Sequence, residues 1–178
     1  KYLLGFTKSA FMKMGCSDED SDVIAEVFLA AELRGHSSHG MLRLKDYYEL
    51  WKSGRINVSP AVKVVYESPG TAVVDGDNAV GMVAARRSMQ IAIEKAKQVG
   101  TGWVSVQNSN HFGIAAHHAM MALEHDMMGI AMTNASPLVA PTFSIDKMLG
   151  TNPICVAAPA GTEPAFVADL ATTTAANG

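Results

Sequence analysis

Apolar positions in the first third of the chain recur with the period of an α-helix. A short helix is expected over residues 1–14. Ser17, with Asp20 three positions later, is typical of a capping box and opens a second helix that ends near Gly35. One apolar face of that helix is formed by Val23, Ile24, Val27, Phe28 and Ala31. A third helix is expected over residues 40–53.

Beyond a Ser-Pro break near residue 60, the period changes to that of short strands. The β-branched runs 62–68 and 71–77 are separated by a Ser-Pro-Gly turn, which predicts an antiparallel pair. A helix ending at Gly100, a strand over 102–108 and a helix over 113–126 follow. Buried strands are then expected at the short apolar runs GIAMTN (129–134), ICVAAPA (154–160) and AFVADLA (165–171).

These elements predict an α/β protein with two parts. Residues 1–59 form a helical N-terminal segment, and residues 60–178 form a mixed-sheet α/β domain. The chain has neither the G-x-G-x-x-G nor the G-x-x-x-x-G-K-[ST] pattern, so the motifs favour neither a Rossmann nor a P-loop domain. It stops soon after an apolar strand-like run with no closing helix. We therefore expect it to be the N-terminal part of a longer polypeptide.

The charge and the cysteines of the chain limit which binding partners and which cellular compartment are expected. The net charge is −3 and no basic stripe or polybasic run occurs, which argues against nucleic acid and anionic lipid as partners. Apolar stretches are interrupted well before the roughly 20 residues that a membrane helix needs. Cys16 and Cys155 lie far apart and are expected to be reduced thiols. A cytoplasmic location follows as an expectation.

Polar chemistry is concentrated in RGHSSHGMLRL, residues 34–44. Imidazole moves protons near neutral pH, and an arginine binds carboxylates with two parallel hydrogen bonds. If the third helix begins near Gly40, His39 lies at its N-terminal edge and Arg43 one turn inside, so both could face one ligand. A solvated polar linker is the plain alternative. His36 and His39 could also bind metal, but zinc needs three or four ligands.

A second histidine, His111, stands in NSNHFG between a predicted strand and a predicted helix. Polar residues at the carboxyl end of a strand lie where α/β proteins bind ligands. Asn108 and Asn110 could orient the imidazole or a ligand, or they could cap the following helix.

Three further turns carry hydroxyls and amides next to apolar runs. They are MTNASP (132–137), LGTNPI (149–154) and ADLATTT (168–174). Such turns expose backbone amides that can bind a carboxamide, a ribose or a phosphate. They are also common in loops that have no binding role. Asp169, at the end of a strand, could hold a ribose, and Thr172, Thr173 and Thr174 could meet phosphate.

Taken together, ELRGHSSHGMLRL, NSNHFG, TNASPLVAP, LGTNPI and ADLAT resemble the malate/L-lactate dehydrogenase family in order and separation. Its members are NAD(P)-dependent 2-oxoacid reductases unrelated to the Rossmann-type lactate and malate enzymes. The likeness covers about Leu29 to the last residue. It implies a non-Rossmann cofactor domain, NAD or NADP as cofactor, and a homodimer. One departure is Phe143-Ser144, where many members carry Gly-Gly.

The resemblance also implies roles for individual residues. His39 and His111 match the family's catalytic histidines, either of which could move the proton, and Arg43 matches the residue that holds the substrate carboxylate. Further substrate contacts are implied for Ser38, Tyr47 and Asn152. The segments implied to contact the dinucleotide contain Asn134, Ala135, Ser136, Asp169, Leu170, Ala171 and Thr172.

The expected function is hydride transfer between NAD(P) and a small 2-hydroxy or 2-oxo acid, with malate and oxaloacetate first. Lactate, ureidoglycolate, diketogulonate or an imine substrate of the same family are alternatives. No metal is expected. Two other classes stay open: a metal-dependent hydrolase, resting on the six histidines, and a catalytically inactive dinucleotide-binding sensor.

Overall fold

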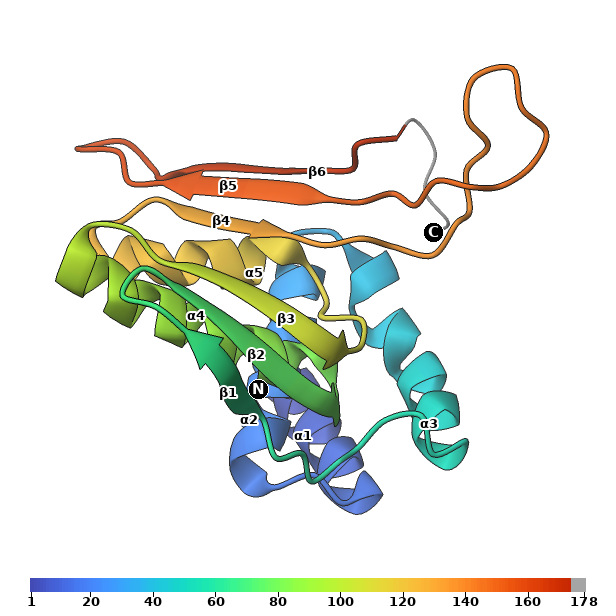
Figure 1. The fold of residues 1–178 in the computed structure, drawn as a ribbon. Helices are drawn as coiled ribbons and strands as arrows, with labels where there is room; N and C mark the ends of the chain where they lie inside the picture. The colour runs from blue at the N-terminus through green and yellow to red at the C-terminus, as the bar shows by residue number, and fades with distance from the viewer. Residues whose placement is uncertain (174–178) are drawn as a thin grey trace. The chain divides into compact units, whose positions relative to one another are not determined.

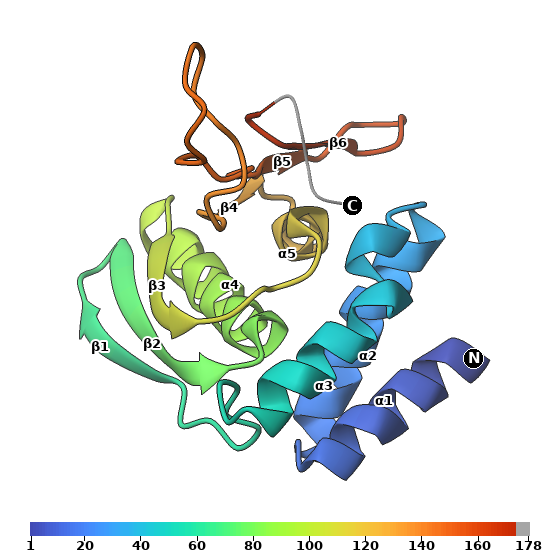
Figure 2. The ribbon, with the colours of Figure 1, turned by 90° about the vertical axis from the view of Figure 1, so that its right-hand side faces the viewer.

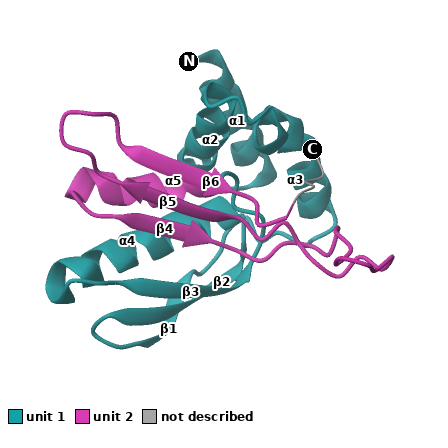
Figure 3. Ribbon diagram, turned by 90° about the horizontal axis from the view of Figure 1, so that it is seen from above, with its two compact units in different colours: residues 1–114 teal, residues 115–178 magenta. Residues whose placement is uncertain are grey.

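The chain forms two compact units in a computed structural model that describes residues 1–173. The first unit is Lys1–Ile114, and the second begins at Ala115 (Figure 3). The first unit thus contains both the N-terminal helices and the first sheet. The boundary near residue 60 that the sequence favours stays a prediction about the organisation of the whole protein.

Three helices open the first unit, as the apolar periodicity predicts (Figure 2). Their bounds are Tyr2–Met14 for α1, Asp18–Leu33 for α2 and Leu44–Lys52 for α3. The Ser17 side chain caps α2 by accepting a hydrogen bond from the Asp20 amide at 3.1 Å. The third helix starts later than expected, because two 3₁₀ turns, η1 (Ser37–His39) and η2 (Met41–Arg43), precede it.

A three-stranded sheet follows in the order β1-β2-β3. The strands span Lys63–Glu67, Thr71–Ala79 and Trp103–Ser109. β1 pairs antiparallel with β2, as predicted, and β3 pairs parallel with β2. The parallel connection is made by α4 (Gly81–Val99), which lies against one face of the sheet (Figures 1 and 2). β3 therefore ends beside the end of β2, and the chain enters the His111 loop there.

Three aromatic rings from different helices form the centre of the first unit's core. Phe11 of α1, Phe28 of α2 and Tyr47 of α3 are each at most 2% exposed. Their ring centroids lie 5.8 Å (Phe11–Phe28), 5.9 Å (Phe11–Tyr47) and 5.6 Å (Phe28–Tyr47) apart. Such pairs contribute about 0.5–1.5 kcal/mol each beyond the burial of their surface. The cluster fixes α3, and with it the tyrosine, against the two preceding helices.

The second unit places a short helix on a three-stranded antiparallel sheet of order β4-β5-β6 (Figure 1). The strands are Gly129–Met132, Ile154–Ala158 and Phe166–Leu170. The helix predicted over 113–126 is divided into α5 (Ala115–Met120) and the 3₁₀ segment η3 (Met121–His125).

Burial in this second sheet alternates along the strands. Cys155 and Ala157 of β5 are fully buried, whereas their neighbour Ile154 is exposed. The prediction of buried strands is wrong for β6, whose end residues Phe166 and Leu170 are exposed. An apolar run in the sequence indicates that a strand can be buried. Which face of the sheet is actually covered depends on where the helices pack.

Candidate active site

The imidazole rings of His39 and His111 stack in the first unit. His39 belongs to the 3₁₀ turn η1, and His111 lies in the loop that follows β3. Their ring centroids are 5.3 Å apart and the rings are inclined by 28°. Two histidines that the sequence picks out in separate motifs thus share one place in the fold.

The turn that carries His39 is held by a carboxylate that sequence reasoning missed. Glu32, near the end of α2, accepts a hydrogen bond from the Ser37 hydroxyl at 3.0 Å and another from the Met41 amide at 2.7 Å. Gly40 lies against the same carboxylate, and a Cβ at this position would collide with the Glu32 side chain. An acid placed just before a polar Gly-rich turn is the signal that could have identified it.

Ser38 joins His39 to Arg43. The Ser38 hydroxyl and the His39 Nδ1 are 3.0 Å apart, within hydrogen-bonding distance. The backbone carbonyl of Ser38 accepts a hydrogen bond from the Arg43 Nε at 2.7 Å. His39 and Ser38 are both half-buried. The predicted neighbours of the catalytic histidine are therefore close to it, although their contact with a substrate stays a prediction.

Arg43 keeps donors for an anion after its internal contacts are made. Besides the Nε bond to Ser38, its Nη1 donates to the Asp46 carboxylate at 3.0 Å. Guanidinium has five N–H groups, so these two bonds leave three that are not used in them. The side chain is 34% exposed. Asp46, a second residue that sequence reasoning missed, fixes the guanidinium without covering it.

Tyr47 reaches His111 from inside the core. Its hydroxyl lies 2.6 Å from the His111 Nδ1 and 2.9 Å from the His111 carbonyl oxygen. Burial raises the pKa of Tyr47 far above its usual range, so the hydroxyl stays protonated. Tyr47 is 2% exposed, and both partners of its hydroxyl belong to the protein. The direct substrate contact implied for Tyr47 stays a prediction. In the structure the Tyr47 hydroxyl contacts His111 instead.

The surroundings of His111 disfavour its charged form. Loss of solvent where the ring packs against Tyr47 lowers the pKa of His111 to about 4, and the positive charges of His39 and Arg43 act in the same direction. The negative charge of Asp46 opposes them. The residue is nevertheless exposed on its outer side, where solvent offsets part of the burial. The direction of the shift makes His111 a neutral imidazole near pH 7.

The two asparagines near His111 hold its loop rather than its imidazole. The Asn110 amide donates to the carbonyl oxygens of Asn78 at 3.0 Å and Ala79 at 2.9 Å, at the end of β2. The Asn108 amide donates to the Asp75 carboxylate at 3.2 Å. The expectation that these side chains orient the ring is therefore corrected: they attach the loop to the neighbouring strand, and Tyr47 contacts the ring.

In the second unit, the three turns with hydroxyls and amides are tied together. The Asn152 Oδ1 accepts a hydrogen bond from the Ala135 amide at 2.9 Å. The Thr172 amide donates to the Thr151 carbonyl at 2.9 Å, and its hydroxyl lies 3.2 Å from the carbonyl oxygens of Thr151 and Asn152. The segments TNASP, LGTNPI and ADLAT thus form one cluster.

Asp169 acts within the second unit as well. Its Oδ2 accepts a hydrogen bond from the Ala116 amide at 2.8 Å, in the first turn of α5. This bond uses one carboxylate oxygen, and a contact of Asp169 with a ribose stays a prediction. Thr174, which the sequence also singles out, lies outside the described residues.

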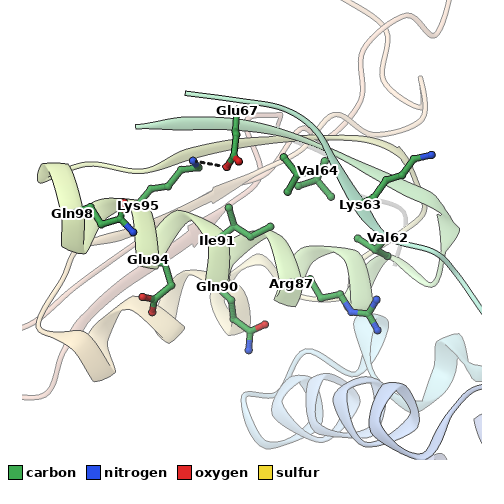
Figure 4. Close-up of a pocket in the computed structure, with 11 residues that line it drawn as sticks. Val62, Lys63, Val64, Glu67, Arg87, Gln90, Ile91, Glu94, Lys95 and Gln98 are labelled. Carbon is green, nitrogen blue, oxygen red and sulfur yellow. Dashed lines mark hydrogen bonds and ion pairs between the residues drawn. The ribbon is translucent and has the colours of Figure 1, made fainter. Parts of the chain in front are cut away.

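A groove between β1 and α4 contains none of the predicted site residues. It encloses about 490 Å³ and is lined by both apolar and charged side chains (Figure 4). The Lys95 ammonium donates to the Glu67 carboxylate at 3.0 Å and to the Ser68 carbonyl at 2.7 Å inside it. Within residues 1–173 no group of three or more His, Cys, Asp or Glu side chains is placed to hold a metal ion.

The first unit therefore brings together two neighbouring imidazoles, of which that of His111 is neutral near pH 7, and the guanidinium of Arg43. The guanidinium has N–H donors beyond those used in its bonds to Ser38 and Asp46. Such an arrangement of groups is suited to acid–base chemistry on an anionic small molecule. The sequence profile of the malate/L-lactate dehydrogenase family matches residues 1–178. The chain belongs to the malate/L-lactate dehydrogenase family.

Similar proteins share both sequence and fold. Malate dehydrogenase from Pyrococcus abyssi is 46% identical over 170 residues, which are 96% of this chain and 47% of that protein. The solved structure of malate dehydrogenase from Pyrococcus horikoshii matches with a TM-score of 0.94 at 46% identity, over 97% of this chain and 49% of that one. Sulfolactate dehydrogenase from Methanocaldococcus jannaschii matches with a TM-score of 0.94 at 42% identity, over 98% of this chain and 50% of that one. The chain spans about half the length of the relatives it matches.

Proposed function

We propose that the whole protein is an NAD(P)-dependent dehydrogenase of small 2-hydroxy acids. The single observation that supports this most strongly is the stacking of His39 on His111, with the Arg43 guanidinium beside them. A dehydrogenase of this kind needs a group to move the hydroxyl proton and a cation to hold the carboxylate next to the reacting carbon. The first unit supplies both.

Malate is the substrate we propose first, and sulfolactate is the second candidate. Relatives at 45–47% identity over most of this chain are named malate dehydrogenase and L-sulfolactate dehydrogenase. Both acids carry a carboxylate beside the hydroxyl-bearing carbon, and the open N–H groups of Arg43 suit that carboxylate. Ureidoglycolate and an imine substrate are less favoured, because the relatives named for them are only 34% and 28% identical to this chain.

The histidines carry the proton in this proposal. During oxidation of the hydroxy acid, the hydroxyl proton passes to an imidazole nitrogen, the C2–H bond breaks with its electron pair, and the C–O bond becomes a carbonyl. A bound NAD(P) would supply the hydride acceptor for this step, or the hydride donor in the reverse reaction. With its pKa lowered, His111 is a neutral imidazole near pH 7 and so has a ring nitrogen lone pair that can accept the proton. His39 lies close enough to be the alternative.

The turns of the second unit fit a dinucleotide. Asn134, Ser136 and Thr172 are exposed or nearly so, and Leu170 and Ala171 beside them are exposed as well. Gly150 packs so tightly on the Ala135 backbone that no Cβ would fit, which keeps the cluster compact. We assign residues 134–136 and 169–172 to cofactor binding, with NAD or NADP left to the test below.

The test is an absorbance assay of the full-length protein. Oxidation of NADH or NADPH would be followed with oxaloacetate, sulfopyruvate and pyruvate, each with both cofactors. We expect turnover with oxaloacetate, and His39→Gln and His111→Gln should each lower kcat strongly. Absence of oxidation with every pair would contradict a dehydrogenase and favour the sensor alternative if the cofactor still bound.

We also propose that the protein is a homodimer and cytoplasmic. The dimer follows from the family resemblance, with the helical N-terminal segment on the substrate and dimer side. The compartment is proposed from cysteine usage: the chain has two cysteines, Cys16 and Cys155, which lie far apart in the sequence and are both buried. Among the described residues, no helix has both the length and the apolar character needed to cross a membrane. Sedimentation of the full-length protein would test the dimer.

A further inference from the structure

We propose that Tyr47 is a positioning residue that holds His111 in the Nδ1–H tautomer and so makes Nε2 the proton-transfer atom. The inference concerns this tyrosine and this histidine alone, and it rests on the proposed function only for its kinetic consequence. It assigns to Tyr47 a role different from substrate binding.

A count of hydrogens fixes the tautomer. The Tyr47 hydroxyl has one proton and two close partners, the His111 carbonyl oxygen at 2.9 Å and the His111 Nδ1 at 2.6 Å. A carbonyl oxygen can only accept, so the hydroxyl proton satisfies both contacts only when it points to the carbonyl. The Nδ1 must then carry a hydrogen and donate it to the tyrosine oxygen. In the Nε2–H tautomer the hydroxyl proton would point to Nδ1. The lone pairs of the Tyr47 oxygen and the His111 carbonyl oxygen would then face each other at 2.9 Å.

One backbone amide competes for the same nitrogen. The Gly113 N–H lies 3.4 Å from the His111 Nδ1, at the outer limit of a hydrogen bond, and would prefer an unprotonated Nδ1. The Tyr47 oxygen is much closer to Nδ1, at 2.6 Å, so its contact favours the tautomer with a hydrogen on Nδ1. If the hydroxyl were removed, the Gly113 amide would be the remaining partner of Nδ1. The ring would then shift to the Nε2–H tautomer.

The tyrosine cannot turn away from the histidine. Its ring is packed edge-on against Phe11 at 5.9 Å and tilted against Phe28 at 5.6 Å, and all three rings are buried. Its hydroxyl is thus held by the core, while Nε2 lies on the ring edge away from Nδ1. A neutral His111 with its hydrogen on Nδ1 presents a lone pair at Nε2, which is what a proton acceptor needs.

The groups that face His111 are few. His39 stacks on it from η1, Arg43 and Asp46 approach from η2 and the start of α3, and Tyr47 lies behind it. The positive neighbours oppose a second charge on the ring, and Asp46 partly compensates. Loss of the tyrosine hydroxyl would therefore change both the tautomer and the pH at which His111 titrates.

The test uses Tyr47→Phe in the full-length protein, with Tyr48→Phe as the matched control. Phenylalanine keeps the buried ring, whereas Tyr48 is 44% exposed and packs at a tilt against Trp51. In ¹⁵N-histidine-labelled protein, two-bond nitrogen–proton correlations distinguish the Nδ1–H and Nε2–H tautomers, and the signal missing from His111→Gln identifies residue 111. This measurement needs neither substrate nor turnover.

We expect His111 to be the Nδ1–H tautomer in the parent protein and in Tyr48→Phe, and the Nε2–H tautomer in Tyr47→Phe. Tyr47→Phe should also lower kcat on the order of 10- to 100-fold with KM nearly unchanged, and displace the pH profile. An Nε2–H ring in the parent, or an unchanged ring and pH profile in Tyr47→Phe, would overturn the assignment. Absence of any dehydrogenase activity would instead contradict the proposed function and leave the tautomer result to be judged by itself.

Discussion

His39 and His111 face each other with their ring centroids 5.3 Å apart. Two imidazolium ions at this separation repel each other, so the pair favours states with a single positive charge. The arrangement suits a site that takes up and gives back one proton in each turnover. It also means that a substitution at either histidine changes the titration of the other.

Acid should destabilise the protein through His111. Because its pKa is lowered from 6.5 to about 4, the unfolded chain binds more protons than the folded one between these two values. The free energy of unfolding therefore contains a contribution that is fully present above pH 6.5 and is lost as the pH falls toward 4. His111→Gln removes it, so this variant should lose less stability than the parent on acidification. Urea titrations of both at about pH 7.5 and about pH 5 would show this, and an equal loss in both would contradict it.

Arg43→Lys should weaken substrate binding. Lysine keeps the charge but cannot form two parallel hydrogen bonds with a carboxylate, and it loses the Nε bond to the Ser38 carbonyl. We expect KM for the 2-oxo acid to rise about 10- to 100-fold, as for the loss of one charge-assisted hydrogen bond. Lys45→Arg, on the neighbouring exposed residue, should leave KM unchanged. Steady-state kinetics of the full-length protein decide, and an unchanged KM in Arg43→Lys would remove this residue from the substrate site.

Gly113→Ala should destabilise the His111 loop more than Gly35→Ala destabilises its own turn. Both glycines have a left-handed backbone, with φ of +79° and +77°. A Cβ at Gly35 meets open space, whereas at Gly113 it collides with the Val27 side chain. Backbone strain alone should cost about 1–2 kcal/mol at either site. The collision should add about 1–3 kcal/mol at Gly113. Denaturation midpoints of the two variants measure the difference, and equal values would show that the core yields at Val27.

Ser17→Ala should lower the free energy of unfolding by about 1 kcal/mol, the usual effect of losing a helix cap. The Asp20 amide would lose the Ser17 hydroxyl as its hydrogen-bond acceptor in the first turn of α2. Ser17→Thr retains the hydroxyl and should recover most of the loss. Urea denaturation of the three proteins tests this, and equal stability of parent and alanine variant would mean that water replaces the cap.

Local signals explain what the sequence predicted well. The cap at Ser17 and the stop at Gly100 depend on neighbouring residues only, and both are found in the structure. The Ser-Pro-Gly turn likewise predicts the β1–β2 pair, because turn and strands are adjacent in the chain. Such features need no knowledge of the tertiary fold.

Contacts between distant residues explain what the sequence did not reveal. The bond from Tyr47 to His111 joins residues 64 positions apart, and no local pattern announces it. The 3₁₀ turns before α3 depend on the Glu32 carboxylate from the preceding helix. Motif order placed His39, Arg43 and His111 in one family site, but their mutual geometry required the fold.

One departure from the family pattern has a conformational meaning. At Phe143, where the family resemblance leads us to expect glycine, the backbone has φ of +65° and the side chain is fully exposed. This region of backbone space favours glycine and is strained for a bulky residue. This chain therefore places a strained residue at a position whose backbone conformation favours glycine.

The aromatic cluster of Phe11, Phe28 and Tyr47 makes the site hard to transplant. Grafting the two histidine motifs onto another scaffold would copy His39 and His111 but leave the latter without the hydrophobic wall and hydroxyl behind it. The N-terminal helix, whose Phe11 packs against Tyr47, would have to be transferred with them. Deletion of α1 should therefore disturb the contact of Tyr47 with His111 before it disturbs the turns of the second unit.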